Sequence, residues 1–152
     1  PDGLEIALRR LRMAAVIQFT MPGSPTIYYG DEAGQQGFED PFNRRTYPWG
    51  HENTDLLSHY RNIGALRTAH PVYRRGAFRL LYLDDSLLLF LREGEGEQLL
   101  TAVNIATHEV SVATEKISED LLSGKVLTVH RIPACAATVI DLKENKTIKF
   151  TI

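Results

Sequence analysis

The sequence predicts an α/β segment followed by an all-β antiparallel sandwich. Apolar residues recur at helical spacing over residues 4–19, and a β-branched and aromatic run follows at residues 26–29. After Pro71 the chain changes to short strand-like runs separated by turn residues. All five lysines of the chain lie after that proline. Together these observations predict a boundary between residues 1–70 and residues 71–152.

The first element is a helix over residues 4–19. Its apolar stripe consists of Leu4, Leu8, Leu11, Ala15 and Phe19. Asp2 is the expected N-cap, and the Pro22-Gly23 pair ends the helix. The stripe predicts packing against another part of the protein.

The run from Thr26 to Tyr29, between Pro25 and Gly30, is apolar without alternation, except for Thr26. Such a run is typical of a strand covered on both faces, as in a parallel sheet. A single strand of this kind between two helices has two unpaired edges. We therefore expect its neighbours to come from chain that is not in this sequence, which makes the 152 residues a fragment.

Residues 30–50 lack regular periodicity and are rich in glycine, proline, charged and aromatic residues. Ordered loops of this length are usually functional, and loops at the carboxyl ends of α/β strands build ligand sites. A second helix follows, capped by Asn53 or Thr54 and ending at His70-Pro71. Its apolar stripe consists of Leu56, Tyr60, Ile63 and Leu66.

The second part of the chain is expected to contain six or more strands. The predicted strands are residues 77–83, 86–92, 98–104, 109–112, 125–131 and 136–142. Turns are expected at Asp84-Asp85, residues 94–96, residues 104–107 and Glu144-Asn145. Cys135 is predicted to be a small buried apolar residue in a strand.

Composition excludes several classes of function. The net charge of −2 gives no electrostatic basis for binding nucleic acid or an anionic membrane, and no apolar run is long enough to cross a bilayer. One cysteine excludes an internal disulfide framework and a zinc site built from several cysteines. It favours a reducing compartment, and a cytoplasmic location is expected. The histidines lack metal-ligand spacing, so neither a metal nor a cofactor is predicted.

Two adjoining motifs resemble those of a known family. The stretch MPGSPTIYYGDE at residues 21–32 resembles a signature of the α-amylase family of glycoside hydrolases, where it forms the eighth strand of a (β/α)8 barrel. GFEDPFNRRTYPW at residues 37–49 is similar to a loop of the neopullulanase, cyclomaltodextrinase and maltogenic-amylase branch and of related α-glucosidases. The resemblance implies that residues 1–70 are the C-terminal end of a catalytic TIM barrel and residues 71–152 a C-terminal β-sandwich.

The resemblance also implies an activity. The parent protein would hydrolyse or transfer α-glucosidic bonds of maltooligosaccharides, cyclodextrins or starch-like glucans, with retention of configuration. The family's three catalytic acids precede the eighth strand, and no His-Asp pair precedes Leu4. We therefore expect no catalytic residue here and no activity of the isolated chain. Asp31 and Glu32 are no substitute, because adjacent residues of an extended chain point to opposite faces; a structural or orienting role is expected for both.

Asp40 and Arg44 are the candidate substrate-binding residues. In the neopullulanase-like branch that this loop resembles, an Asp and an Arg at this spacing contact donor-side glucose units. The alternative is that the two residues form an ion pair that stabilises the loop. Arg45 is expected to be structural. Trp49 is expected to be a buried aromatic anchor, with stacking on a sugar face as the alternative.

Three classes of function stay open at this stage. The first is the glycosidase, with an α-glucan substrate and the upstream barrel of the same polypeptide as partners; a homodimer is left open. The second is a non-enzymatic relative, such as the ectodomain of an amino-acid-transporter heavy chain. The third is a free-standing carbohydrate-binding β-sandwich, which would need neither the first helix nor the run at residues 26–29.

Overall fold

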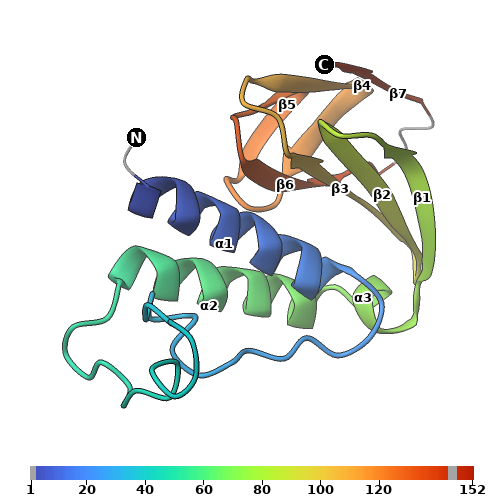
Figure 1. The fold of residues 1–152 in the computed structure, drawn as a ribbon. Coiled ribbons are helices and arrows are strands. Elements are labelled where there is room, and N and C mark those ends of the chain that lie inside the picture. Colours follow the sequence, from blue (N-terminus) through green and yellow to red (C-terminus); the bar gives the residue numbers. More distant parts are fainter. Residues whose placement is uncertain (1–2, 144–146) are drawn as a thin grey trace.

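The computed structural model describes residues 3–143 and 147–152. Two long helices lie side by side against a curled sheet, and a long loop extends from the helical end (Figure 1). The elements are α1 (Gly3–Thr20), α2 (Thr54–Ala69), α3 (Val72–Arg75), β1 (Ala77–Leu83), β2 (Leu87–Gly94), β3 (Glu97–Asn104), β4 (Val110–Asp120), β5 (Lys125–Ile132), β6 (Ala136–Asp141) and β7 (Ile148–Thr151).

Both predicted helices are confirmed. One face of the C-terminal half of α1 is buried through Ala15, Val16, Phe19 and Thr20, whereas Leu4 at its start is 49% exposed. The Oδ1 atom of Asn53 accepts the backbone N–H of Leu56 over 2.9 Å, which is the expected N-cap of α2. The apolar stripe of α2 is buried, and the helix ends before His70 as predicted. The proposed N-cap of α1, Asp2, lies outside the described residues.

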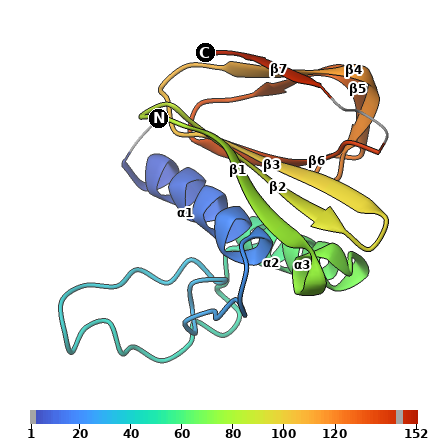
Figure 2. The same ribbon diagram turned by 90° about the vertical axis from the view of Figure 1, so that its right-hand side faces the viewer.

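The strands form one antiparallel sheet in the order β1-β2-β3-β6-β4-β5, with β7 paired to β4. The sheet curls into two facing layers (Figure 2). The layers are joined at β4, which pairs with β6 at Glu119 and Asp120 and with β5 on either side of a shift in register between Ala113 and Ser118. All six predicted strands are present, β4 is longer than predicted, and β7 was not predicted. The predicted turn at Glu144-Asn145 lies outside the described residues.

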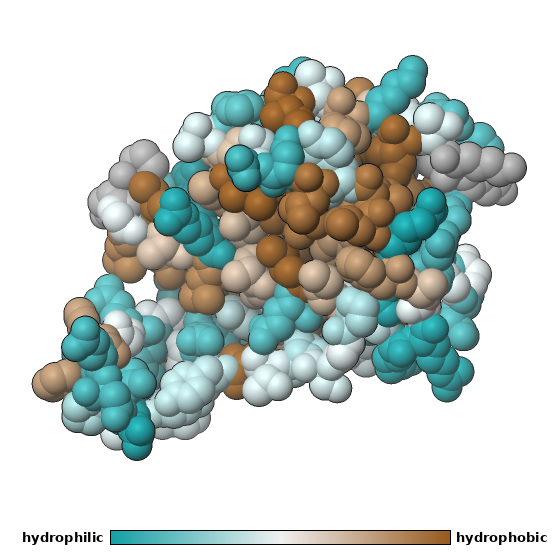
Figure 3. Space-filling view, turned by 45° about the vertical axis from the view of Figure 1, so that its right-hand side comes forward, coloured by the Kyte–Doolittle hydropathy of each residue, from teal (hydrophilic) through white to brown (hydrophobic). Residues whose placement is uncertain are grey.

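Two hydrophobic clusters lie on opposite faces of the sheet. Because successive strand residues face opposite sides, Leu99 of β3 packs among the helices while Leu100 packs between the two layers. The helical cluster also includes Phe19, Tyr60 and Val139, so the helices and the sheet share a core. Apolar side chains also gather on the face of the molecule seen in Figure 3. A groove of about 390 Å³ opens between the two layers, with β1 and β2 on one side and β7 on the other.

The predicted buried strand at residues 26–29 is wrong for this structure. The segment is extended but unpaired, and Ile27, Tyr28 and Tyr29 are 40%, 53% and 45% exposed. A strand requires a ladder of backbone hydrogen bonds to a neighbouring strand, and none of the described strands pairs with this segment. Local β propensity alone therefore does not produce a strand.

The prediction for Cys135 is also wrong. The residue lies in the turn before β6, with a φ of 51° and a half-buried side chain. The apolar run that contains it is divided by the turn that reverses the chain between β5 and β6.

Arg92 of β2 is the largest fully buried side chain, with only 2% of its surface exposed. Its guanidinium donates to carbonyl oxygens in three segments. The acceptors are Thr20 (3.0 Å), Val72 (3.0 Å), Tyr73 (3.2 Å), Gly76 (2.9 Å) and Ala77 (3.3 Å). A buried charge is tolerated when its donors are satisfied. The end of α1, helix α3 and the start of β1 are therefore joined through one side chain.

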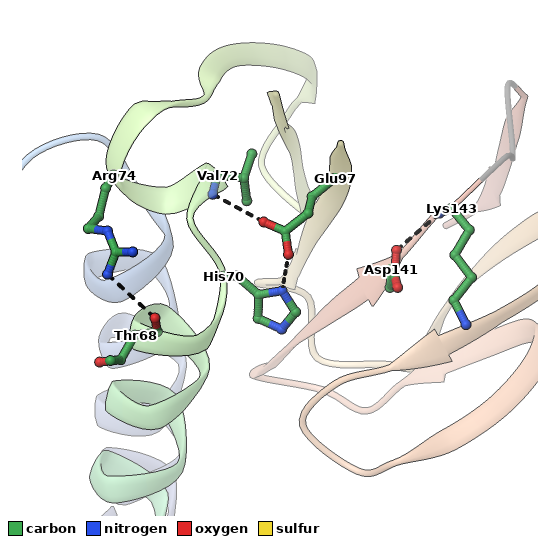
Figure 4. A network of polar contacts seen from close by, with 7 residues as sticks. All are labelled: Thr68, His70, Val72, Arg74, Glu97, Asp141 and Lys143. Atoms are coloured by element: carbon green, nitrogen blue, oxygen red, sulfur yellow. Dashed lines mark hydrogen bonds and ion pairs between the residues drawn. The ribbon is translucent and has the colours of Figure 1, made fainter. Parts of the chain in front are cut away.

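Glu97 makes a second connection between the helices and the sheet (Figure 4). One carboxylate oxygen lies 2.5 Å from His70 Nδ1, and the other accepts the backbone N–H of Val72 over 3.1 Å. These contacts bind the junction of α2 and α3 to the first residue of β3.

Replacing Arg92 by methionine should greatly destabilise the chain. The change preserves much of the apolar volume but leaves several buried carbonyl groups without donors, so we expect a loss of about 3 kcal/mol or more in the free energy of unfolding. Urea unfolding followed by circular dichroism measures this loss. The matched control is Arg79→Met on exposed β1, where an ion pair with Glu93 is expected to contribute less than about 1 kcal/mol. Equal effects of the two substitutions would contradict the role given to Arg92.

Candidate functional site

The candidate site is the loop of residues 30–50, which is fixed to the protein at the start of α2. The backbone N–H of Asn53 donates to the carbonyl oxygen of Ala33 over 2.9 Å, and Ala33 is buried. Gly30 lies in the left-handed region with a φ of 94°, and a Cβ there would lie 2.3 Å from Gln35 Oε1. The left-handed conformation favours glycine at this position, and a larger residue would also displace the Gln35 side chain.

Asp31 and Glu32 lie in this anchored part of the loop. Glu32 Oε2 accepts the backbone N–H of Gly30 over 2.9 Å and so closes the turn. Burial raises the pKa of the Asp31 carboxyl, and the neighbouring Glu32 charge raises it further. Burial also raises the pKa of Tyr60 in α2 to about 12, with smaller contributions from Asp31 and Glu32. The pair thus lies between the loop and the core, and the orienting role remains a prediction.

The structure brings Asp40 and Arg44 together at the surface. Arg44 Nε lies 2.8 Å from Asp40 Oδ1, and Arg44 Nη2 donates to Oδ2 over 3.3 Å. The Asp40 side chain is 59% exposed and the Arg44 side chain is 69% exposed. An ion pair this exposed contributes little to stability. Its remaining hydrogen-bonding capacity is therefore free to meet a polar ligand.

Arg45 contributes through both its backbone and its side chain. Its carbonyl oxygen accepts the hydroxyl of Tyr29 over 2.9 Å, which links the extended segment to the far side of the loop. Its guanidinium carbon lies 5.2 Å from the centre of the Phe38 ring, within the range of a cation–π interaction. The structural role expected for Arg45 stays a prediction.

The expected burial of Trp49 is wrong for this structure. The side chain is 79% exposed and contacts the Tyr47 ring at a centroid distance of 4.6 Å. The indole has no core to enter because no described residue covers this side of the loop. A large apolar side chain left in this position is available to a sugar face or to another part of a protein.

A hollow of about 250 Å³ lies beside the loop, and the sequence interpretation did not identify it. Its walls are formed by Tyr28, Tyr29, Gly30, Asp31, Gln35, Gly37 and Asn43. Within the described part of the chain, the buried oxygens Gln35 Oε1 and Asn43 Oδ1 have no hydrogen-bond partner. No sequence pattern marks these amides, because glutamine and asparagine are common in ordinary loops.

No group of three His, Cys, Asp or Glu side chains suited to a metal ion occurs among residues 3–143 and 147–152. None of the helices in the described part of the chain combines the length and apolar character that crossing a bilayer requires.

Comparisons with known proteins decide the family. No protein-family model matches the chain. A cyclomaltodextrinase of a Bacillus species is 35% identical over 137 residues, which cover 86% of this chain and 22% of that protein. The crystal structure of the α-amylase of Geobacillus thermoleovorans, solved with acarbose, superposes with a TM-score of 0.81 at 28% identity, over 92% of this chain and 34% of that one. The chain belongs to the α-amylase family.

A further relative of this α-amylase-family chain is an amylopullulanase of Thermoanaerobacter thermohydrosulfuricus. It is 37% identical over 144 residues, which cover 83% of this chain and 10% of that protein. The chain thus spans between 10% and 34% of the lengths of these three proteins. The comparisons also support assigning the antiparallel sheet to the C-terminal β domain of this family.

Replacing Asp31 by asparagine should stabilise the chain near neutral pH. The raised pKa means that the ionised carboxyl is less favourable in the folded than in the unfolded state. The stability of the wild type relative to Asp31→Asn should therefore fall as pH rises from the unfolded-state pKa through the folded-state pKa. At pH values well below the ordinary value of 3.8, both states are protonated and this electrostatic difference disappears.

Urea midpoints of both proteins at about pH 7 and about pH 3 measure this effect, since the two values lie on either side of the titration. Asp85→Asn, in an exposed turn, is the control. A wild type that is the more stable protein at neutral pH would contradict the desolvation of Asp31.

Proposed function

We propose that this chain is the C-terminal part of a retaining glycoside hydrolase that acts on α-glucosidic bonds of maltooligosaccharides, cyclodextrins or starch-like glucans. Residues 1–70 would be the C-terminal end of its TIM barrel, and residues 71–152 its C-terminal β-sandwich. The relatives named cyclomaltodextrinase and amylopullulanase support this substrate class. The single cysteine favours a cytoplasmic protein, and a homodimer is left open.

The observation that carries the proposal is the uncovered state of the segment that bears the family motifs. Ile27, Tyr28 and Trp49 are exposed, although side chains of this kind are usually buried. Upstream strands of a barrel would pair with residues 26–29 and cover these rings. The same strands would supply the catalytic acids, which we propose are absent from this chain.

The loop after residue 30 would contribute substrate contacts. The Asp40 carboxylate accepts hydrogen bonds from hydroxyl groups, and the Arg44 guanidinium donates them. Their ion pair at 2.8 Å holds both groups ready without burying them. The two groups together would recognise donor-side glucose hydroxyls, and Trp49 would lie close enough along the chain to add a ring face.

The isolated chain should not hydrolyse a chromogenic maltooside. Two carboxyl groups about 5–5.5 Å apart across the bond are needed for retention. Glu32 closes a turn and Asp40 is held by Arg44, so each of these two loop carboxylates is already engaged within the loop. Release of the chromophore by the purified chain, compared with buffer, measures this. Turnover near 1 s⁻¹ or faster would contradict the proposal.

In the full-length protein, Arg44→Ala should lower kcat/KM for maltooligosaccharides about 10- to 100-fold, the effect of losing one or two charge-assisted hydrogen bonds. The melting temperature should change little, because the pair is exposed. Arg75→Ala, on an exposed turn of α3, is the control and should leave kcat/KM unchanged. Unchanged kinetics for Arg44→Ala would restrict Arg44 to a structural ion pair.

Two further observations distinguish the other classes of function, one on the full-length protein and one on residues 71–152. Absence of the three acids upstream, together with no hydrolysis, would favour the non-enzymatic relative. Micromolar binding of maltotriose by residues 71–152 alone would favour the carbohydrate-binding module. The shared cluster of Phe19, Leu99 and Val139 argues against that module, because removing the helices would expose one face of the sheet.

A further inference from the structure

A groove of about 430 Å³ lies between α1 and the turn that precedes β6, and it shares no residue with the loop of residues 30–50. This volume is within the range of sites that hold small molecules. Its apolar walls are formed by Met13, Val16, Leu122, Pro133, Ala134, Ala136 and Ala137. Four of these residues are proline or alanine, so short side chains leave the space open.

Arg9 and Arg12, which lie three residues apart on the same side of α1, both line this groove. Arg9 forms an ion pair with Glu5. Arg12 has no carboxylate partner within the described ranges, and no acidic side chain lines the groove. The groove therefore carries one positive charge that the described residues do not neutralise.

His59 adds a neutral polar group. Burial lowers the pKa of its imidazole, which favours the neutral ring at pH 7. Its Nε2 atom lies 3.0 Å from the carbonyl oxygen of Arg12, so Nε2 carries the proton and donates it. The ring thus holds the α1 backbone in place and contributes no charge that would repel or attract a ligand.

We propose that this groove binds a small organic carboxylate with an apolar body. The alanine and proline walls suit the apolar part, and the Arg12 guanidinium suits the carboxylate, which it can bind through two parallel hydrogen bonds. This site is independent of the proposed glucan contacts, because none of the residues that line the groove belongs to the loop of residues 30–50.

Cys135 offers a direct measurement of occupancy. It is the only cysteine of the chain, and it is half-buried in the wall of the groove. Its Sγ atom lies 4.0 Å from the carbonyl oxygen of Ala106, which is a weak contact. A ligand in the groove should therefore slow alkylation of this thiol.

The experiment follows alkylation of the full chain by iodoacetamide, a neutral reagent, with 4-phenylbutyrate as the probe. With a Kd of about 1 mM, a probe concentration of about 10 mM should slow the reaction about tenfold. The uncharged 4-phenylbutyramide at the same concentration should slow it less than about twofold, because it cannot replace the ion pair with Arg12. This comparison requires no variant, so it does not depend on the folding of a mutant.

Two variants test the role of the charge. Arg12→Gln should abolish protection by the carboxylate, while Arg10→Gln, exposed on α1 and outside the groove, should retain it. Circular dichroism checks that both variants are folded. Equal protection by acid and amide, equal loss in both variants, or no protection at all would overturn the proposal. The last result would identify the groove as a surface that packs against protein.

Discussion

The arrangement of the molecule depends on the buried guanidinium of Arg92. Transferring this charge out of water is costly, and burial lowers the pKa of the group. Five carbonyl oxygens offset the cost, and they belong to the end of α1, to α3 and to the start of β1. One side chain of the sheet thereby fixes where the first helix ends and where the first strand begins. The helices can then cover one face of the sheet in a defined position.

The same region sets the course of the segment that bears the family motifs. Arg67 of α2 donates to the carbonyl oxygens of Phe19 and Gly23, and to that of Met21 over 3.2 Å. At its other end, the loop is held by the hydrogen bond from Asn53 to Ala33 and by the cap of α2. Residues 26–29 and residues 36–50 extend from these anchors with their rings uncovered. A loop that binds a ligand, or that packs against further chain, needs fixed ends and exposed side chains. These residues have both.

The two candidate sites differ in the ligand chemistry that they suit. At the loop, Asp40 and Arg44 neutralise each other and leave hydrogen-bonding groups, which suits a neutral polyhydroxyl ligand. At the groove beside α1, an unneutralised guanidinium lies next to short apolar side chains, which suits an amphipathic anion. The two sites therefore need not compete for a ligand.

The sequence alone determined the elements whose signals are local. The stripe of α2, the cap at Asn53 and the strands from β1 to β6 follow from periodicity and turn residues, and the two motifs led to the α-amylase family. Only the tertiary structure decided whether a segment has a strand to pair with and whether a side chain has a core to enter. Residues 26–29 have strand propensity but no neighbour to pair with, and Trp49 has no core to enter. Arg92 resembled an ordinary strand cation, and its burial follows from carbonyl groups up to 72 residues away in sequence, which no local pattern reveals.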